Sequence, residues 1–241
     1  MKYLIKALLP EFIIKYIKLI IQKNLYQRSY NPEDMLIRHL FSIHTNSKLL
    51  KNDGFYVDVG AYHPTVGSMT YSFYRDGWNG INVDANIESI NDFKRMRSRD
   101  INIFAAVSDT EDTLKYHKYE VGAVNTLSTE RSINDIKGHT LIDTIDIETK
   151  RLDSILDSFL PNGKKIDFFS VDAEGFDLKV LKSNNWKKYR PTYVYVEERM
   201  KDIYNPKKNV FVEYMSKINY KLITVTPNNL LFEDTLLQDD S

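Results

Sequence analysis

Residues 55–86, FYVDVGAYHPTVGSMTYSFYRDGWNGINVDAN, decide how this chain folds. The run Phe55–Val59 is apolar, with β-branched and aromatic side chains, which is typical of a buried parallel strand. Gly60 then allows a tight turn and a close approach of the backbone to a ligand. The next residues predict a helix over about 65–77 and a second strand over Gly80–Asp84. Strand, glycine turn, helix and strand in this order predict a mononucleotide-binding βαβ unit.

Two acidic residues of this unit lie where a ligand would bind. Asp58 is near the end of the first strand and Asp84 ends the second, and open α/β sheets bind ligands beyond the carboxyl ends of their strands. A carboxylate at Asp84 can accept hydrogen bonds from both hydroxyls of a ribose. The turn after Gly60 and the start of the helix favour an anionic group. The alternative is a doubly wound domain whose strand happens to end in Gly-Ala.

The dinucleotide fingerprint G-x-G-x-x-G is missing from the turn. Gly60 is followed by Ala61, Tyr62 and His63, with no second glycine two positions on. A pyrophosphate needs the close approach that this glycine gives, so the sequence argues against NAD and FAD. A ligand with a ribose and an adenine but no phosphate fits better, and S-adenosylmethionine is the cofactor we predict.

The composition sets limits on the class of protein. The length of 241 residues suits one α/β domain with small additions. Lys and Arg together number 33, as do Asp and Glu, so no overall positive charge attracts nucleic acid. The chain has no cysteine, which excludes disulfides, thiolate zinc sites and cysteine nucleophiles and is compatible with the cytoplasm.

The first fifty residues predict an amphipathic helical extension ahead of an α/β domain over residues 51–241. Residues 1–22 have apolar residues at helical spacing with lysines between them, and Pro10 divides them into two helices. The lysines exclude an uninterrupted membrane span, and no cleavage site of a secretory signal is evident. Such a helix can dock on its own domain, join two subunits in a homodimer, or lie on the inner face of a membrane. We therefore expect a cytoplasmic protein, with peripheral membrane contact as one alternative.

The remainder of the chain predicts five more strands, with helices between most of them. The strands are expected over residues 101–107, 166–171, 191–196, 221–226 and 230–233, and the last two form an antiparallel hairpin. Residues 113–150 read as an insertion between the third and fourth strands. The fold class we predict is therefore α/β, with a seven-stranded, mostly parallel sheet, a C-terminal antiparallel hairpin and N-terminal helices.

Four acidic residues follow the fourth and fifth strands: Asp172, Glu174, Glu197 and Glu198. Adjacent strands lie about 5 Å apart, so Asp172 and Glu197 can reach a common point. Like charges that close require a cation, a proton or a basic side chain between them. Mg²⁺ or Mn²⁺ would serve, and would lower the pKa of a hydroxyl bound to it. The alternatives are a carboxylate that acts as general base without metal, or pairing with Lys179 or Arg199.

His63 is a second candidate for the general base. It follows the predicted cofactor turn directly, and the pKa of a histidine is ordinarily near 6.5. It could remove a proton from a hydroxyl, or it could be a plain turn residue.

These residues resemble the FkbM family of S-adenosylmethionine-dependent methyltransferases. The resemblance rests on VDVGA (57–61), GINVDAN (80–86), NIFAAVSD (102–109) and DFFSVDAEGFDLKVLKSNNW (167–186), and covers about residues 54–198. It implies a Rossmann-like fold and O-methylation of sugar hydroxyls in surface polysaccharides or of secondary metabolites. The implied cofactor site comprises Asp58, Gly60, Asp84 and Ser108, with Ala61, Ala85, Asn86 and Asp109 beside them. Ser108 or Asp109 would contact the adenine edge, or else form a turn.

A weaker likeness connects the acidic cluster to metal-dependent O-methyltransferases that act on catechols and macrolide sugars. It implies metal ligands at Asp172 and Glu197, with Glu198 or Glu174. One departure from the FkbM pattern concerns the cofactor turn, where the usual Gly-Ala-Asn-x-Gly is Gly-Ala-Tyr-His-Pro-Thr-Val-Gly. Tyr62 or Ser68 would then replace the missing asparagine.

We therefore expect an S-adenosylmethionine-dependent O-methyltransferase that acts on a sugar hydroxyl, in a nucleotide sugar or a polysaccharide component. A nucleic-acid methyltransferase is one rival, but it needs an Asn-Pro-Pro-Tyr-like site where this chain has the acidic residues 172–175. A different small-molecule methyltransferase or an inert binding module with the same fold are the others.

Overall fold

The structure, a computed structural model, describes residues 33–44, 53–134, 136, 138–199 and 205–236. The helices predicted over 1–22 lie outside these residues. The first described element is α3 (Glu33–His44). None of the helices in the described ranges combines the length and the apolar character that crossing a bilayer requires.

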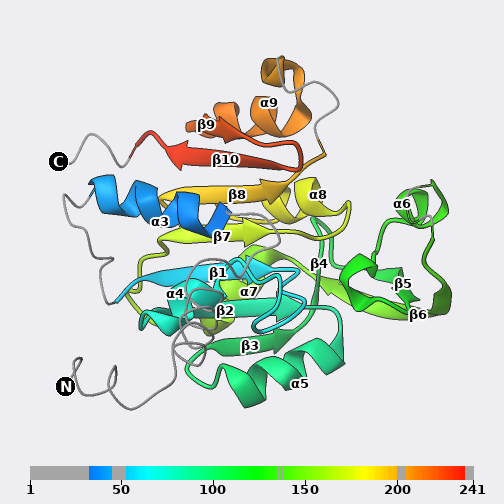
Figure 1. Ribbon diagram of the computed structural model, residues 1–241. Helices are drawn as coiled ribbons and strands as arrows, with labels where there is room; N and C mark the ends of the chain where they lie inside the picture. The colour runs from blue at the N-terminus through cyan, green and yellow to red at the C-terminus, as the bar shows by residue number, and fades with distance from the viewer. Residues whose placement is uncertain (1–32, 45–52, 135, 137, 200–204, 237–241) are drawn as a thin grey trace, which may run out of the picture.

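The centre of the domain is a seven-stranded sheet (Figure 1). Its strands are β1 (Phe55–Val59), β2 (Asn79–Asp84), β3 (Ile101–Phe104), β7 (Phe168–Val171), β8 (Tyr193–Glu197), β9 (Tyr220–Val225) and β10 (Asn229–Asp234), in the order β3-β2-β1-β7-β8-β10-β9. The first five are mutually parallel, and β10 is antiparallel to β8 and β9. The predicted sheet with its C-terminal antiparallel hairpin is confirmed.

Strand order reverses between β1 and β7, because the chain builds outward from β1 through β2 to β3 before it returns to β7. In such sheets a crevice opens beyond the carboxyl ends of the strands at this point, since the connections leave in opposite directions. The functional residues should therefore gather at the ends of β1, β2 and β7.

Helices cover both faces of the sheet, and the residues of each strand alternate between them. They are α4 (Tyr71–Arg75), α5 (Ile87–Met96), α7 (Leu152–Phe159), α8 (Asp177–Lys182) and α9 (Val210–Lys217). Val57 packs in the core under α7, α8 and α9, whereas its neighbour Tyr56 belongs to the core with α3 and α4. In that second core Phe41 of α3 makes edge contacts with the rings of Trp78 and Tyr193.

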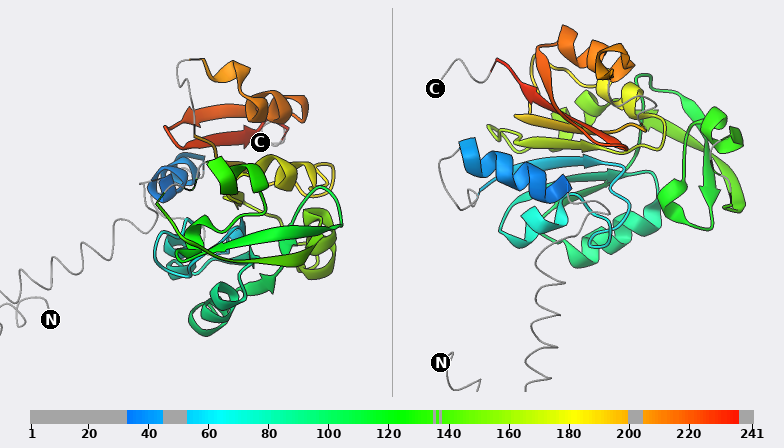
Figure 2. Two further views of the ribbon diagram at one scale, coloured as in Figure 1. Left: turned by 90° about the vertical axis from the view of Figure 1, so that its right-hand side faces the viewer. Right: turned by 45° about the horizontal axis from the view of Figure 1, so that its top comes forward.

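Residues 106–134 and 138–150 form an arm at the carboxyl end of the strands (Figures 1 and 2). The arm contains β4 (Ala106–Val107), β5 (Thr113–Tyr119), the short 3₁₀ helix η1 (Gly122–Val124), α6 (Thr129–Asn134) and β6 (Leu141–Lys150). β6 pairs with β4 and β5 in a small three-stranded sheet. Viewed from its end, the arm lies in front of the strand ends (Figure 2, left).

Two predicted elements are wrong in their bounds. The helix predicted over about 65–77 is limited to α4, because Gly67 has a positive φ of 70° and the N–H groups of Thr65 and Val66 donate to His63 Nδ1 instead of to helical carbonyls. The strand predicted over 101–107 breaks at Ala105, whose N–H donates to Asp84 O, and its end leaves the main sheet to pair with β6.

Candidate active site

The ends of β1, β2 and β7 converge at Gly60. Its φ is +79°, and a Cβ at this position would lie 1.7 Å from the carbonyl oxygen of Asp172. Its N–H donates to Val83 O at 2.9 Å, which ties the turn to the end of β2. Only glycine meets both requirements, since other residues are strained at this φ and would collide with the β7 end. The turn therefore draws the strand ends together at the point where strand order reverses.

Asp84 lies at the end of β2 with its carboxylate fixed by the backbone. Its two oxygens accept hydrogen bonds from the N–H groups of Tyr62 (2.8 Å) and Asn86 (2.7 Å). Asn86 also caps α5 by accepting from Glu88 N at 3.2 Å. A carboxylate has about four acceptor positions, so Asp84 keeps capacity for two ligand hydroxyls. The pKa of Asp84 is raised to about 6, mainly by burial and in smaller part by the nearby charge of Asp58, against the lowering effect of the two backbone hydrogen bonds.

A hollow of about 520 Å³, open to solvent, lies over Asp84. One side is formed by the strand ends, and the other by residues of the arm, which include Tyr116, Gly122, Asn125 and Leu127. Tyr116 is 4% exposed. Its burial and the nearby charge of the Asp84 carboxylate both raise the pKa of its phenol. No sequence pattern indicates these arm residues, because nothing in the sequence of residues 113–127 shows that this segment folds back over the end of β2.

A second hollow, of about 660 Å³, adjoins the first. Both are lined by Gly60, Tyr62, Ala123, Asp172 and Glu174, so they adjoin along the strand ends, and together they make up the groove. The second hollow adds further groups around Asp172, namely Asp58, Ala61, Ser68, Ser170 and Glu197. Its wall is therefore strongly acidic.

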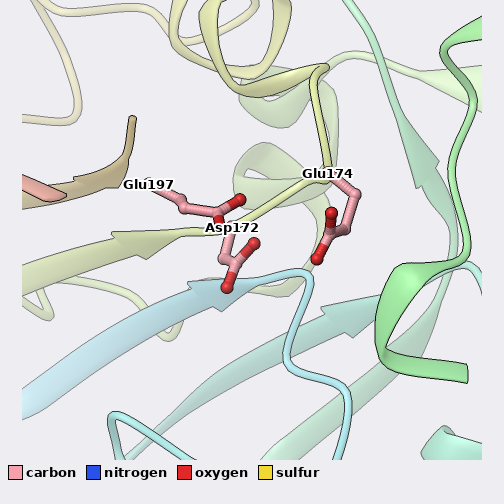
Figure 3. Close-up of side chains that lie close together, drawn as sticks. All are labelled: Asp172, Glu174 and Glu197. Atoms are coloured by element: carbon pink, nitrogen blue, oxygen red, sulfur yellow. The ribbon is translucent and has the colours of Figure 1, made fainter. Parts of the chain in front are cut away.

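Asp172, Glu174 and Glu197 point toward one another at the ends of β7 and β8 (Figure 3). One oxygen from each lies within 4.8 Å of the others. Glu198, the fourth predicted ligand, does not join them, because consecutive strand residues point to opposite faces. Its carboxylate accepts a hydrogen bond from Asn209 Nδ2 at 3.0 Å.

Arg131 of α6 supplies the positive charge that the cluster needs. Its guanidinium pairs with Glu174 and lies 3.8 Å from a carboxylate oxygen of Glu197. The two basic side chains considered from sequence contribute less: Arg199 Nε is 3.9 Å from Glu197 and 63% exposed, and the Lys179 ammonium lies over the ring of Phe176. No sequence signal points to Arg131, which is 43 positions from Glu174.

Asp172 has a strongly perturbed carboxyl. Its side chain is accessible from the groove, but protein surrounds it on the other sides, and this desolvation raises its pKa well above the usual range. The charges of Glu197 and Asp177 and a hydrogen bond with Glu197 act in the same direction, whereas Arg131 lowers the pKa. A carboxylate whose pKa is raised in this way accepts a proton more readily than a free one, as a general base requires.

The donor set of the cluster fits a hard divalent cation. Asp172, Glu174 and Glu197 would offer three oxygens to Mg²⁺ or Mn²⁺, which prefer such ligands. Arg131 would have to release Glu174 for an ion to bind there.

The other predicted residues are placed differently. His63 lines neither hollow, and its Nδ1 accepts the backbone N–H groups of Thr65 and Val66, which places it in the turn. Ser108 is fully buried, donates to Asp109 Oδ1 at 3.3 Å, and neither residue is among those that line the two hollows. Ala85 lines the first hollow.

Comparison with known proteins gives one family match and several similar structures. The family model for the methyltransferase FkbM domain matches residues 58–222. Among solved structures, a methyltransferase from Geobacter sulfurreducens is similar at 12% identity and a TM-score of 0.42, with 97% of this chain and 94% of the other covered. An O-methyltransferase from Bacillus cereus, crystallised with SAH, has 11% identity and a TM-score of 0.40, with 97% and 96% covered. No curated protein matches the chain.

The family match begins at Asp58, near the end of β1, and includes the turn at Gly60, Asp84 and the acidic cluster, and thus every residue that lines the groove. The predicted resemblance is confirmed, and it carries the general activity, methyl transfer that depends on S-adenosylmethionine. This chain belongs to the FkbM family of methyltransferases.

Proposed function

We propose that this protein transfers a methyl group from S-adenosylmethionine to a hydroxyl oxygen of a sugar, in a nucleotide sugar or a surface polysaccharide component. The observation that carries the proposal is the groove, with the Asp84 carboxylate and its two unfilled acceptor positions at one end and the cluster of Asp172, Glu174 and Glu197 at the other.

The charges of the groove favour one direction in which the cofactor would lie. Asp84 would accept hydrogen bonds from the ribose hydroxyls, with Tyr116 and the arm covering the adenosine from the other side. The second hollow, lined by Asp58 and Asp172, is acidic. The sulfonium and the ammonium group of S-adenosylmethionine are cationic, so these groups belong in the second hollow.

The acidic cluster suits an acceptor that must lose a proton. S-adenosylmethionine supplies a methyl group on sulfur, and transfer forms a C–O bond while the S–C bond breaks, releasing neutral S-adenosylhomocysteine. The acceptor hydroxyl loses its proton in the same step, and Asp172 is the carboxylate we assign as its acceptor. Glu174 and Glu197, held by Arg131, would bind the neighbouring hydroxyls of the sugar. Alignment of the three reacting atoms would supply much of the acceleration.

A divalent cation at the same three carboxylates, with Arg131 displaced from Glu174, is the alternative arrangement of the proposal. Bound by Asp172, Glu174 and Glu197, Mg²⁺ or Mn²⁺ would supply a Lewis acid that lowers the pKa of the acceptor hydroxyl. Loss of activity in a chelator, restored by either ion, would support this arrangement. Full activity in the chelator would leave Asp172 as base without metal.

Mass spectrometry after incubation with S-adenosylmethionine and a panel of nucleotide sugars tests the proposal. We expect one acceptor to gain a single methyl group, and Asp172→Asn to abolish that gain while cofactor binding persists. Methylation of an amine or of nucleic acid in the same assay, with no sugar modified, would contradict the acceptor class.

Calorimetric titration with S-adenosylmethionine separates this enzyme from an inert binding module with the same fold. An active enzyme must bind the cofactor, and a module that has lost the site would not. Binding is therefore the first measurement to make, before any acceptor is tried.

A further inference from the structure

A row of polar side chains crosses the sheet on the face opposite to α7 and α8. Asn102, Asn82, Asp58 and Ser170 lie side by side in register on β3, β2, β1 and β7. Asp58 is 3% exposed, Ser170 1% and Asn82 fully buried. Buried polar groups are costly unless they are hydrogen-bonded, so this row needs polar partners above it.

Arg97, at the end of α5, provides them. Its side chain is fully buried, with Nε donating to Asp100 at 2.8 Å and one terminal nitrogen donating to the phenol oxygen of Tyr56 at 2.6 Å. The Tyr56 hydroxyl donates onward to Asp100, whose carboxylate also accepts from Asn82. This arrangement neutralises the buried guanidinium and fixes its position between α5 and the sheet.

The remaining nitrogen of Arg97 points at the cofactor turn. Nη1 donates to the hydroxyls of Thr70 (2.9 Å) and Ser68 (3.2 Å), and it lies 3.5 Å from the carbonyl oxygen of Pro64. Three points of the loop that follows Gly60 are thus fixed by one side chain.

Thr70 passes this constraint to Asp58. Its hydroxyl oxygen accepts from Arg97, which can only donate, so its single proton is directed to Asp58 Oδ2 at 2.8 Å. Thr70 stands at the N-cap of α4, where a threonine usually accepts a backbone N–H, but here its hydroxyl makes no capping hydrogen bond. The residue is therefore used for its link between Arg97 and Asp58.

We propose that Arg97 and Thr70 are positioning residues for the cofactor site, which hold Asp58 and the turn after Gly60 in the arrangement that binds S-adenosylmethionine. The inference rests on the proposed function, because it needs the groove to be the cofactor site. Neither residue lines the groove, so each acts through another.

The test compares Thr70→Val with Thr70→Ser by calorimetric titration with S-adenosylmethionine. Valine keeps the shape but removes the proton that Asp58 accepts, so we expect the dissociation constant to rise about tenfold or more, the size of one hydrogen bond to a charged group. Serine keeps the hydroxyl and should restore binding to within about threefold. Arg97→Lys keeps the charge but offers one nitrogen in place of three, and should weaken binding at least as much as valine.

Tyr220→Phe is the matched control. It removes another buried hydroxyl, that of Tyr220 on β9, away from the groove. This hydroxyl donates to Pro191 O at 2.8 Å. We expect it to lower the thermal midpoint while the dissociation constant stays unchanged. If Thr70→Val stays folded and binds S-adenosylmethionine within about twofold of the unchanged chain, the proposed role of Thr70 in positioning Asp58 is overturned. If the unchanged chain does not bind the cofactor, the proposed function itself fails.

Discussion

The Asp84 carboxylate both anchors two backbone N–H groups and has a pKa close to the physiological range. Its buried carboxylate is held by two backbone N–H groups, yet its pKa is raised to about 6 because burial outweighs those hydrogen bonds. It is ionised at neutral pH, and a modest fall in pH protonates it.

Cofactor binding should therefore weaken in mild acid. At the proposed cofactor site, the charged form of Asp84 above about pH 6 would accept both ribose hydroxyls and attract the cationic cofactor, and protonation below that value would remove one acceptor and the charge. We expect the dissociation constant of S-adenosylmethionine, measured by calorimetry, to rise about tenfold between about pH 7.5 and pH 5.

Asp84→Asn tests the assignment of this pH effect. It should bind weakly at neutral pH and lose most of the difference between the two pH values. A pH profile in Asp84→Asn as steep as that of the unchanged chain would assign the effect to another carboxyl.

Gly60 has a natural control in Gly163, which has a similar positive φ but no atom within 4 Å of the position that a Cβ would take. We expect Gly163→Ala to cost about 1 kcal/mol for the left-handed backbone alone, and Gly60→Ala to cost at least about 2 kcal/mol more. Urea unfolding of both variants measures the difference. Equal losses would mean that the approach of β1 to the Asp172 carbonyl is not tight.

At the scale of elements, the strands and their end residues can be predicted, and the segments between them cannot. Asp84, Asp172 and Glu197 are found because each follows an apolar run that marks a strand, and parallel strands bring such ends to one edge. Arg131 and Tyr116 belong to the arm, whose fold back onto the sheet follows from tertiary contacts that local sequence does not specify. In the sequence, Arg97 is one more charge at the end of an amphipathic helix.

The docking of α6 on the acidic cluster can be tested through Arg131. Arg131→Gln removes the charge shared by Glu174 and Glu197, and three uncompensated carboxylates should then bind a cation more strongly. We expect Mn²⁺, followed by electron paramagnetic resonance, to bind about tenfold more tightly than to the unchanged chain.

Lys115→Gln is the control for this experiment. It also removes a positive charge from the arm, but from an exposed pair with Asp146, so Mn²⁺ affinity should not change. Equal Mn²⁺ affinities in Arg131→Gln and the unchanged chain would show that the guanidinium does not compensate the cluster.

At the scale of the whole molecule, Arg190 links the end of β10 to the end of α9, away from the groove. Its guanidinium holds both oxygens of Asp234, which is 1% exposed at the end of β10, and donates to Ile218 O at the end of α9. Removal of one partner from a largely buried pair leaves the other charge unpaired.

Arg190→Met should therefore lower the free energy of unfolding by about 3 kcal/mol without changing cofactor affinity. Chemical denaturation and calorimetry measure the two quantities. Arg95→Met, at an exposed pair with Asp92, should lower stability by less than about 1 kcal/mol. A change in cofactor affinity in Arg190→Met would mean that the hairpin is coupled to the groove.

The pairing of β4 with β6 has an evolutionary consequence. Val107 and Lys150 are register partners, so the chain departs from the domain and rejoins it at neighbouring positions. A change of length between them that spares Tyr116, residues 122–127 and Arg131 leaves in place both the strands that carry Asp84 and Asp172 and the arm residues at the groove. Changes confined to the rest of the arm can therefore alter its outer surface without moving the site.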